Sequence, residues 1–301
     1  MLNTTSWTPN SGVTNHTGQT ILENSNFFAM PPIEIGQIIS AESTLTGKKT
    51  SLTILKFLAT RGLWWNFAIT LVILLVLSTP LTIFFPALII FVIYDFNQAN
   101  RPNCSYVGEN GFARFTAKRK RLSHPKSTIF CFQDDMAMYT NRTNFIVNGH
   151  YTHTEYSFIW RRDRKELHKF NGRFNRNKNL PTDYPFFLAC AVETAWIYYL
   201  QRKIPTQLDI AGYVEFPAEG RFKAIRIGSG FVEFVSNKGE LQRLLESEIK
   251  TIRQYSGSIK FIPHDLQRAW VINKYNFQYG SIANFQLFIP LIKNLTKIQI
   301  N

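Results

Sequence analysis

The sequence predicts an α+β protein in which a transmembrane hairpin of two helices is followed by two β-rich modules, each closed by a helix. Three observations support this fold class. The segment Leu63 to Tyr94 has no charged side chain over 32 positions. After it, short runs of β-branched and aromatic residues alternate with turn residues, which is typical of antiparallel sheets. Two such series each end in an apolar stretch with helical spacing.

Composition restricts the classes of protein to which the chain can belong. Of its 301 residues 45% are hydrophobic and 18% are charged, which excludes a disordered chain. A mean hydropathy of −0.12 excludes a transporter with many spans. The three cysteines, Cys104, Cys131 and Cys190, are widely spaced and form no CxxC motif. This usage is typical of reduced, structural thiols.

The uncharged segment defines the predicted hairpin, residues 55–97. A single helix over its uncharged positions would be about 48 Å long, more than the ~30 Å hydrocarbon core of a bilayer. Pro80 and Pro86 interrupt the run, so we expect two antiparallel helices over about 55–77 and 81–96. Basic residues flank both sides, so the positive-inside rule predicts both termini in the cytoplasm and localisation in the inner membrane. A re-entrant hairpin is the alternative, because the second helix is short.

The residues before the hairpin divide into a tail and a linker. Residues 1–30 are rich in Asn, Thr and Ser and show neither the basic nor the apolar region of a signal peptide. We therefore expect a disordered tail. Residues 31–54 form a juxtamembrane segment, and its apolar stretch Ile33–Leu45 either lies against the membrane or adds a strand to a sheet.

The first β-rich module is expected over residues 103–204. The pair Asn110-Gly111, between two β-type runs, is a strong hairpin signal. The run Tyr151–Trp160 is rich in β-branched and aromatic residues and predicts a long strand. The apolar stretch Phe186–Leu200 predicts the closing helix.

A second module, over residues 212–301, repeats this order. Strands are expected on both sides of turns at Gly230 and Gly257. Asn284 is expected to cap a final helix that runs to about Lys297. In each module the helix would close the open end of a curled sheet with apolar side chains.

This order of elements resembles a known family. Strands closed by one helix and joined to a membrane hairpin are similar to the bacterial pleckstrin-homology-like (PH-like) membrane proteins of unassigned function. The resemblance covers about residues 103–297, and it implies a binding or scaffold module rather than an enzyme. The second module is the more similar one, through Glu248-Ile249-x-x-Ile252, Gly257-Ser258-Ile259 and Ile282-x-Asn284-x-x-x-x-Phe288.

The net charge of +14 is concentrated after the apolar segment, since residues 112–178 hold 15 Lys and Arg against 5 Asp and Glu. Beside a membrane segment, such charge favours anionic lipid head groups as partners. A solvated loop that only keeps the protein soluble is the alternative. The candidate lipid- or partner-binding residues form two runs, Lys118, Arg119, Lys120 and Arg121, and Arg161, Arg162, Arg164 and Lys165.

Other reactive side chains lack the neighbours in sequence that catalysis or metal binding needs. His150, His153 and His168 have no Cys or carboxylate at a familiar metal spacing, so no metal or cofactor is predicted. The pair Asp134-Asp135 has no partner motif for acid/base catalysis. No nucleophile or phosphate-binding motif occurs, and no nucleic-acid recognition signature does. The sequence therefore predicts no enzyme and argues against nucleic acid as a partner.

Taken together, these features predict a membrane-anchored cytoplasmic binding or scaffold protein. Its modules would contact anionic lipid head groups or a protein partner. The alternative is a small oligomeric membrane assembly, channel-like or a complex subunit, with the β-modules as a cytoplasmic collar. Few polar residues occur in the hairpin, and Asn66 and Thr70 share one helix face, which suits helix packing better than a pore lining.

Overall fold

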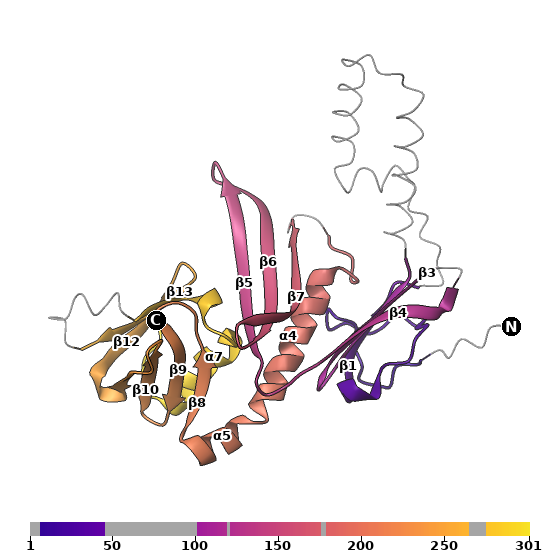
Figure 1. Ribbon diagram of the computed structural model, residues 1–301. Coiled ribbons are helices and arrows are strands. Elements are labelled where there is room, and N and C mark those ends of the chain that lie inside the picture. Colours follow the sequence, from indigo (N-terminus) through magenta and orange to yellow (C-terminus); the bar gives the residue numbers. More distant parts are fainter. Residues whose placement is uncertain (1–6, 46–100, 119–120, 176–178, 265–274) are drawn as a thin grey trace, which may run out of the picture.

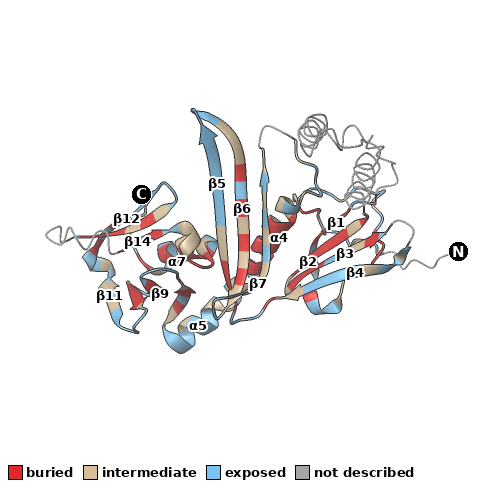
Figure 2. Cartoon of the chain, turned by 45° about the horizontal axis from the view of Figure 1, so that its top comes forward, coloured by how far each residue is buried: buried red, intermediate tan, exposed pale blue. Residues whose placement is uncertain are grey.

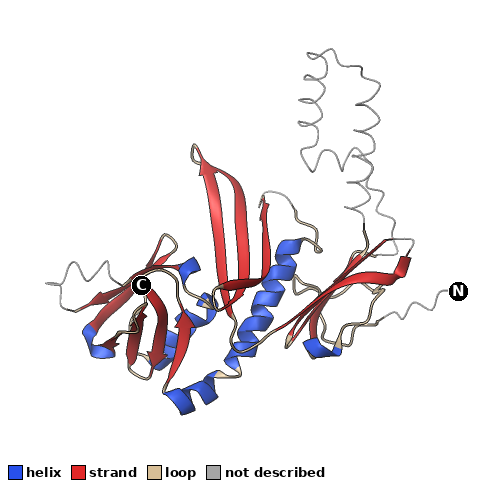
Figure 3. Ribbon diagram, in the orientation of Figure 1, coloured by secondary structure: helices blue, strands red, loops and turns tan. Residues whose placement is uncertain are grey.

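The computed structural model describes residues 7–45, 101–118, 121–175, 179–264 and 275–301. These residues form two halves built mainly from antiparallel strands (Figure 1). In each half a four-stranded sheet is followed along the chain by a three-stranded sheet and then by a helix. Figure 3 shows that strands predominate throughout the described residues.

The first half contains a projecting sheet, which we call the arm. Its four-stranded sheet has the order β1-β2-β3-β4, and the arm has the order β5-β6-β7. The long β5–β6 hairpin extends beyond β7 and α4 (Figure 1). The elements are η1 (Ile33–Ile35), β1 (Ile38–Ser43), β2 (Asn103–Gly108), β3 (Gly111–Lys118), β4 (Arg121–Cys131), β5 (Ala137–Val147), β6 (His150–Arg162), β7 (Lys165–Phe174), α4 (Pro185–Gln201) and α5 (Ile204–Ala211).

The second half pairs a sheet of order β11-β10-β9-β8 with one of order β12-β13-β14, and helix α7 closes it. Charged side chains cross the first of these sheets in register. Arg226 bonds Glu215 through Nε at 2.7 Å and Glu233 through Nη1 at 3.1 Å. The elements are β8 (Tyr213–Pro217), β9 (Phe222–Gly228), β10 (Phe231–Ser236), β11 (Leu241–Leu245), η2 (Glu246–Glu248), β12 (Ile249–Tyr255), β13 (Ser258–Pro263), β14 (Asn276–Gln278), η4 (Tyr279–Ser281) and α7 (Phe285–Leu295).

Aromatic side chains fill the core between the arm and α4. Phe158 and Trp160 on β6 are fully buried, as is Trp196 on α4. Gly172 on β7 lies opposite Tyr156 on β6, and a Cβ there would come within 2.7 Å of the tyrosine hydroxyl. Glycine at this position therefore lets the Tyr156 ring lie across β7 and join the core. This packing fixes the base of the arm against the helix.

Asn284 joins the two halves at the start of α7. Its Oδ1 accepts hydrogen bonds from the backbone N–H of Met138 on β5 at 3.1 Å and from Nε1 of Trp196 at 2.7 Å. Its own N–H donates to the carbonyl of Met138 at 2.7 Å. The expected helix-capping bond is absent, because the side chain is turned toward the first half instead. The left-handed φ of 56° at Asn284, which asparagine tolerates, accompanies this orientation.

The N-terminal segment differs from the predicted disordered tail, residues 1–30, from residue 7 onward. Phe27 and Phe28 are buried, and Trp7 meets the Phe27 ring edge-on at 5.1 Å. These side chains cover the face of β2 and β3 that is turned away from α4, together with Tyr106. The composition is polar, but a few well-spaced aromatic residues bury enough apolar surface to order the segment.

The linker predicted over residues 31–54 adds a strand, which was one of the two alternatives. β1 pairs antiparallel with β2, so it completes a sheet whose other strands begin at residue 103. The first sheet thus extends beyond the predicted module boundaries, 103–204. The reason is that the edge of β2 offers unpaired backbone groups that a nearby apolar segment can satisfy.

The predicted fold class, α+β with a transmembrane hairpin, is wrong. The described residues form four antiparallel sheets and three α-helices, and none of those helices combines the length and apolarity that crossing a bilayer requires. The longest, α4, has 17 residues and would span about 25 Å, short of the ~30 Å hydrocarbon core. The predicted inner-membrane localisation and membrane anchor are corrected by the same finding. Residues 55–97, to which the hairpin was assigned, lie outside the described residues.

We predict that Asn284→Gly lowers the free energy of unfolding by about 2–4 kcal/mol, because it leaves two buried N–H donors without an acceptor while keeping the left-handed backbone accessible. Urea unfolding of the full chain measures this loss. The control is Asn237→Gly, which removes an exposed amide that donates to the carbonyl of Gly220 at 2.8 Å. A loss under about 1 kcal/mol is expected for the control, and equal losses would contradict the role of Asn284.

A second prediction concerns His16, which is buried with its Nδ1 at 2.9 Å from the Ser40 hydroxyl and its Nε2 at 2.8 Å from the Ser105 hydroxyl. Burial lowers the pKa of His16 to about 3. The neutral ring is therefore favoured in the fold. Its contribution to stability is complete above the unfolded pKa of about 6.5 and is lost as the pH falls toward 3.

The test compares the wild type with His16→Gln, whose amide can bond both hydroxyls without titrating. The difference in unfolding free energy between the two proteins should be about 2–3 kcal/mol larger at pH 7 than at pH 4.5. Burial raises the pKa of the nearby Glu42 to about 7, so that group loses its contribution as the pH rises from about 4.5. Taking the difference cancels the Glu42 effect, and a difference independent of pH would refute the assignment.

Candidate functional site

The first predicted basic run lies on the β3–β4 hairpin. Lys118 ends β3 and Arg121 begins β4, and both side chains are exposed. Arg119 and Lys120 lie outside the described residues. No carboxylate forms an ion pair with Lys118 or Arg121 among the described residues. Lys118 and Arg121 thus form an exposed basic surface, and their predicted role in binding stays a prediction.

The second predicted run lies at the β6–β7 turn, and two of its four residues form ion pairs within the fold. Arg161 forms an ion pair with Glu219 of the second half, and its guanidinium lies 5.1 Å from the centre of the Tyr139 ring. Arg162 forms an ion pair with Asp135, with its Nε 2.7 Å from Oδ2. Arg164 and Lys165 remain exposed at the turn. The run therefore helps to hold the two halves together.

The two basic runs do not form one surface. Figure 1 shows the β3–β4 hairpin and the base of the arm on different sides of the first half. At the β6–β7 turn, Arg161 pairs with Glu219 and Arg162 pairs with Asp135, so these two positive charges are directed toward carboxylates of the fold. A single lipid-facing patch made of both runs is therefore not present in the described part of the chain.

The candidate acid/base pair is also tied to cations. Asp134 forms an ion pair with Lys203 and accepts a hydrogen bond from the Tyr199 hydroxyl at 2.5 Å, while Asp135 forms an ion pair with Arg162. The hydrogen bond from Lys203 holds the pKa of Asp134 below its usual range. Both carboxylates border a cavity of about 300 Å³ between the halves, with Asn284 in its wall. Their contacts are those of a structural junction.

The three histidines lie in separate surroundings. His153 stacks on Phe145 with a centroid distance of 4.7 Å and approaches Glu155 at 3.5 Å. His168 lies among aromatic rings, and burial lowers its pKa. His150 begins β6 and is exposed. No group of three His, Cys, Asp or Glu side chains in the described ranges is placed to hold a metal ion.

The tip of the arm carries an exposed apolar surface that the sequence analysis did not single out. Phe145, Ile146 and Val147 are consecutive, and 38%, 63% and 58% of their surfaces are exposed. Figure 2 shows β5 passing from buried at its base to exposed toward this tip. The turn residues Asn148 and Gly149 both have positive φ, as a tight two-residue hairpin requires. A hairpin tip in water is usually polar, so three consecutive exposed apolar residues make this tip a candidate binding surface.

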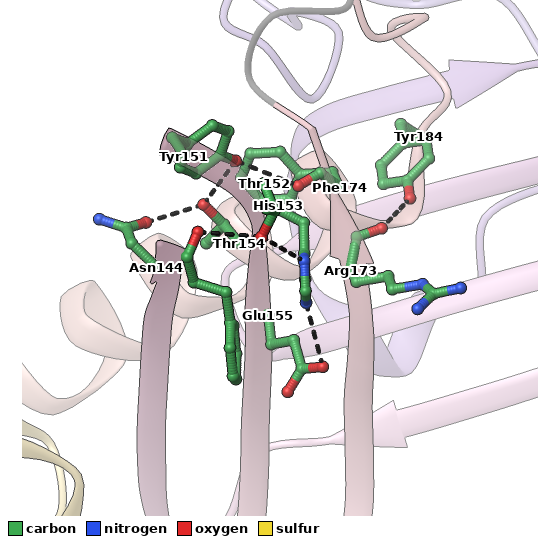
Figure 4. Close-up of polar contacts among 10 residues, drawn as sticks. Asn144, Tyr151, Thr152, His153, Thr154, Glu155, Arg173, Phe174 and Tyr184 are labelled. Atoms are coloured by element: carbon green, nitrogen blue, oxygen red, sulfur yellow. Dashed lines mark hydrogen bonds and ion pairs between the residues drawn. The ribbon is translucent and has the colours of Figure 1, made fainter. Parts of the chain in front are cut away.

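Polar contacts link the three strands of the arm beside this tip (Figure 4). The hydroxyl of Tyr151 on β6 donates to the carbonyl of Phe174 on β7 at 3.2 Å, and it lies 3.0 Å from the Thr154 hydroxyl. Thr154 in turn donates to Oδ1 of Asn144 on β5 at 2.8 Å. All three strands of the arm are therefore linked near the tip. A surface fixed in this way loses little conformational entropy when a partner binds.

The sequence itself carries a signal for the tip. Residues that alternate between the faces of a strand should alternate in polarity, and Phe145-Ile146-Val147 breaks that rule directly before Asn148-Gly149. Such a break beside a tight turn places at least one apolar side chain in solvent.

Comparison with protein-family models finds no match to this chain, and comparison with curated proteins finds no relative. The resemblance to the PH-like family therefore stays a prediction.

Proposed function

We propose that the chain is a binding protein without chemistry of its own, and that the tip of its arm docks on a partner protein. The observation that supports this function is the exposed apolar run Phe145–Val147 at the end of a hairpin that polar contacts hold rigid. Apolar surface presented on a preorganised element is what a protein interface needs.

A protein partner is favoured over anionic lipid head groups by where the two predicted basic runs lie. A lipid-binding tip needs unpaired Lys or Arg beside its apolar residues. Arg161 and Arg162 instead bond carboxylates at the base of the arm, at the opposite end of β6 from the tip. Lys118 and Arg121 lie on a different sheet.

The test places a photoreactive benzoylphenylalanine at Ile146 of the full chain in cells of the source organism. We expect a discrete cross-linked protein product, and we expect Val147→Asp to abolish it because a charge cannot enter an apolar interface. Ile210 on α5, whose side chain is 83% exposed, is the matched control position and should give no such product.

The free energy of unfolding of Val147→Asp and the mass of the cross-linked product make this test decisive. Val147→Asp should change the free energy of unfolding by no more than about 0.5 kcal/mol, because the side chain is exposed at a tip. Lipid adducts alone at Ile146, or no product at all, would overturn the proposal. A product with the mass of two copies of this chain would identify the partner as a second copy.

A further inference from the structure

The outer edge of β5 is partly covered and partly open. β5 is an edge strand of the arm. On the side away from β6, the N–H of Met138 donates to Oδ1 of Asn284, and the C=O of Met138 accepts a hydrogen bond from the Asn284 N–H. Alternate residues of an antiparallel strand direct their backbone groups to the same side, so Thr140 and Arg142 direct theirs to this edge too. Gly280 lies against the carbonyl of Thr140. From Arg142 onward, no described strand pairs with the edge.

A cavity of about 440 Å³ lies directly beside this open edge. Arg142 on β5, Gln286 on α7 and the exposed face of α4, including Ile197 and Tyr198, line it. A second cavity of about 530 Å³ continues along α4 and shares Tyr198 with the first. The side chain of Tyr198 is 57% exposed. An extended chain on the β5 edge would direct alternate side chains into this space.

Two charged side chains line the cavity, Arg142 and Glu193, and Arg142 is the more exposed of the two. Its Nη2 forms an ion pair with Glu193 and lies 3.8 Å from Sγ of Cys190, and its guanidinium carbon lies 5.1 Å from the Phe158 ring centre. Glu193 is only 6% exposed. Nε and Nη1 of Arg142 donate no hydrogen bond to any described residue.

The chain itself shows what such a guanidinium can bind. Arg226 bonds two carboxylates, Glu215 through Nε and Glu233 through Nη1, and Glu233 is also bound by Arg243 at 3.0 Å. Arg142 binds one carboxylate, that of Glu193, through Nη2 alone. Its Nε and Nη1 donors therefore remain available for a ligand. A second carboxylate is therefore the ligand that would complete its hydrogen bonding. The net charge of +14 also favours an acidic partner during encounter.

We propose that an extended acidic peptide segment adds to the β5 edge from Arg142 onward as a fourth strand of the arm, with one of its carboxylate side chains bound by Arg142. The inference rests on the proposed function, because it names how a partner reaches the same arm. Strand addition supplies backbone hydrogen bonds, and Arg142 selects for an acidic side chain.

The experiment uses the full chain and a short labelled peptide of alternating threonine and valine with one central glutamate. Amide hydrogen exchange is followed residue by residue by NMR. The peptide should slow exchange at the Arg142 amide by about tenfold or more, because that N–H gains an acceptor. The Thr143 amide, which faces β6, is the internal control and should not change. Binding without slower exchange at Arg142 would overturn strand addition.

A matched peptide with glutamine in place of glutamate tests the carboxylate site. Wild type should bind the glutamate peptide about tenfold more tightly, the order expected for a charge-assisted hydrogen bond. The double variant Arg142→Gln, Glu193→Gln should lose this preference. It removes both charges together, so no buried carboxylate is left unpaired. An unchanged preference in the double variant would exclude Arg142 as the acid-binding residue.

The two proposals fail in different ways. If Ile146 gives no cross-link but Arg142 is protected by the glutamate peptide, the docking function of the tip fails and the β5 edge is the binding surface. If Ile146 cross-links a protein but neither protection nor a preference for glutamate appears, the tip is the docking surface and the strand-addition inference fails.

Discussion

The buried side-chain amide of Asn284 fixes the position of the two halves relative to each other. Its carbonyl oxygen accepts bonds from β5 and from α4, and its backbone donates back to β5. Polar groups buried at such a junction are costly unless each is satisfied, so the position of one half relative to the other is specific. The same contact covers the base of the β5 edge and leaves its upper part open. The binding geometry of the arm thus follows from how the halves are joined.

Basic residues occur in two settings in this chain. Some pair with carboxylates inside the fold, and others are exposed on the surface. Arg161 and Arg162 meet carboxylates at the base of the arm, and Arg226 links Glu215 to Glu233 across the second half. These arginines stabilise packing. Lys118 and Arg121 remain exposed on a hairpin of another sheet. A run of basic residues in the sequence does not by itself show which role applies, because a distant acid can neutralise it.

The arm combines a fixed base with an exposed end. Its base packs on α4 through fully buried Phe158 and Trp160, and the network around Tyr151 and Thr154 carries that rigidity to the tip. Exposed apolar residues on a flexible loop would be a liability for aggregation. On a rigid hairpin they become a surface of defined shape, and the open β5 edge lies on the same element.

The sequence by itself determined the local elements: the long strand over Tyr151–Trp160 and the helix over Phe186–Leu200 follow from short-range patterns that the structure has, and the hairpin predicted at Asn110-Gly111 turns one residue earlier, at Glu109-Asn110. The predicted fold class, which joined a transmembrane hairpin over 55–97 to two β-rich modules, is wrong, because no described helix is long and apolar enough to cross a bilayer. Only the tertiary structure decided that Trp7 and Phe27 order the N-terminal segment, that Glu219 pairs with Arg161, and that Asn284 faces α4 instead of capping α7. Those contacts join residues far apart along the chain, and no local pattern encodes such partners.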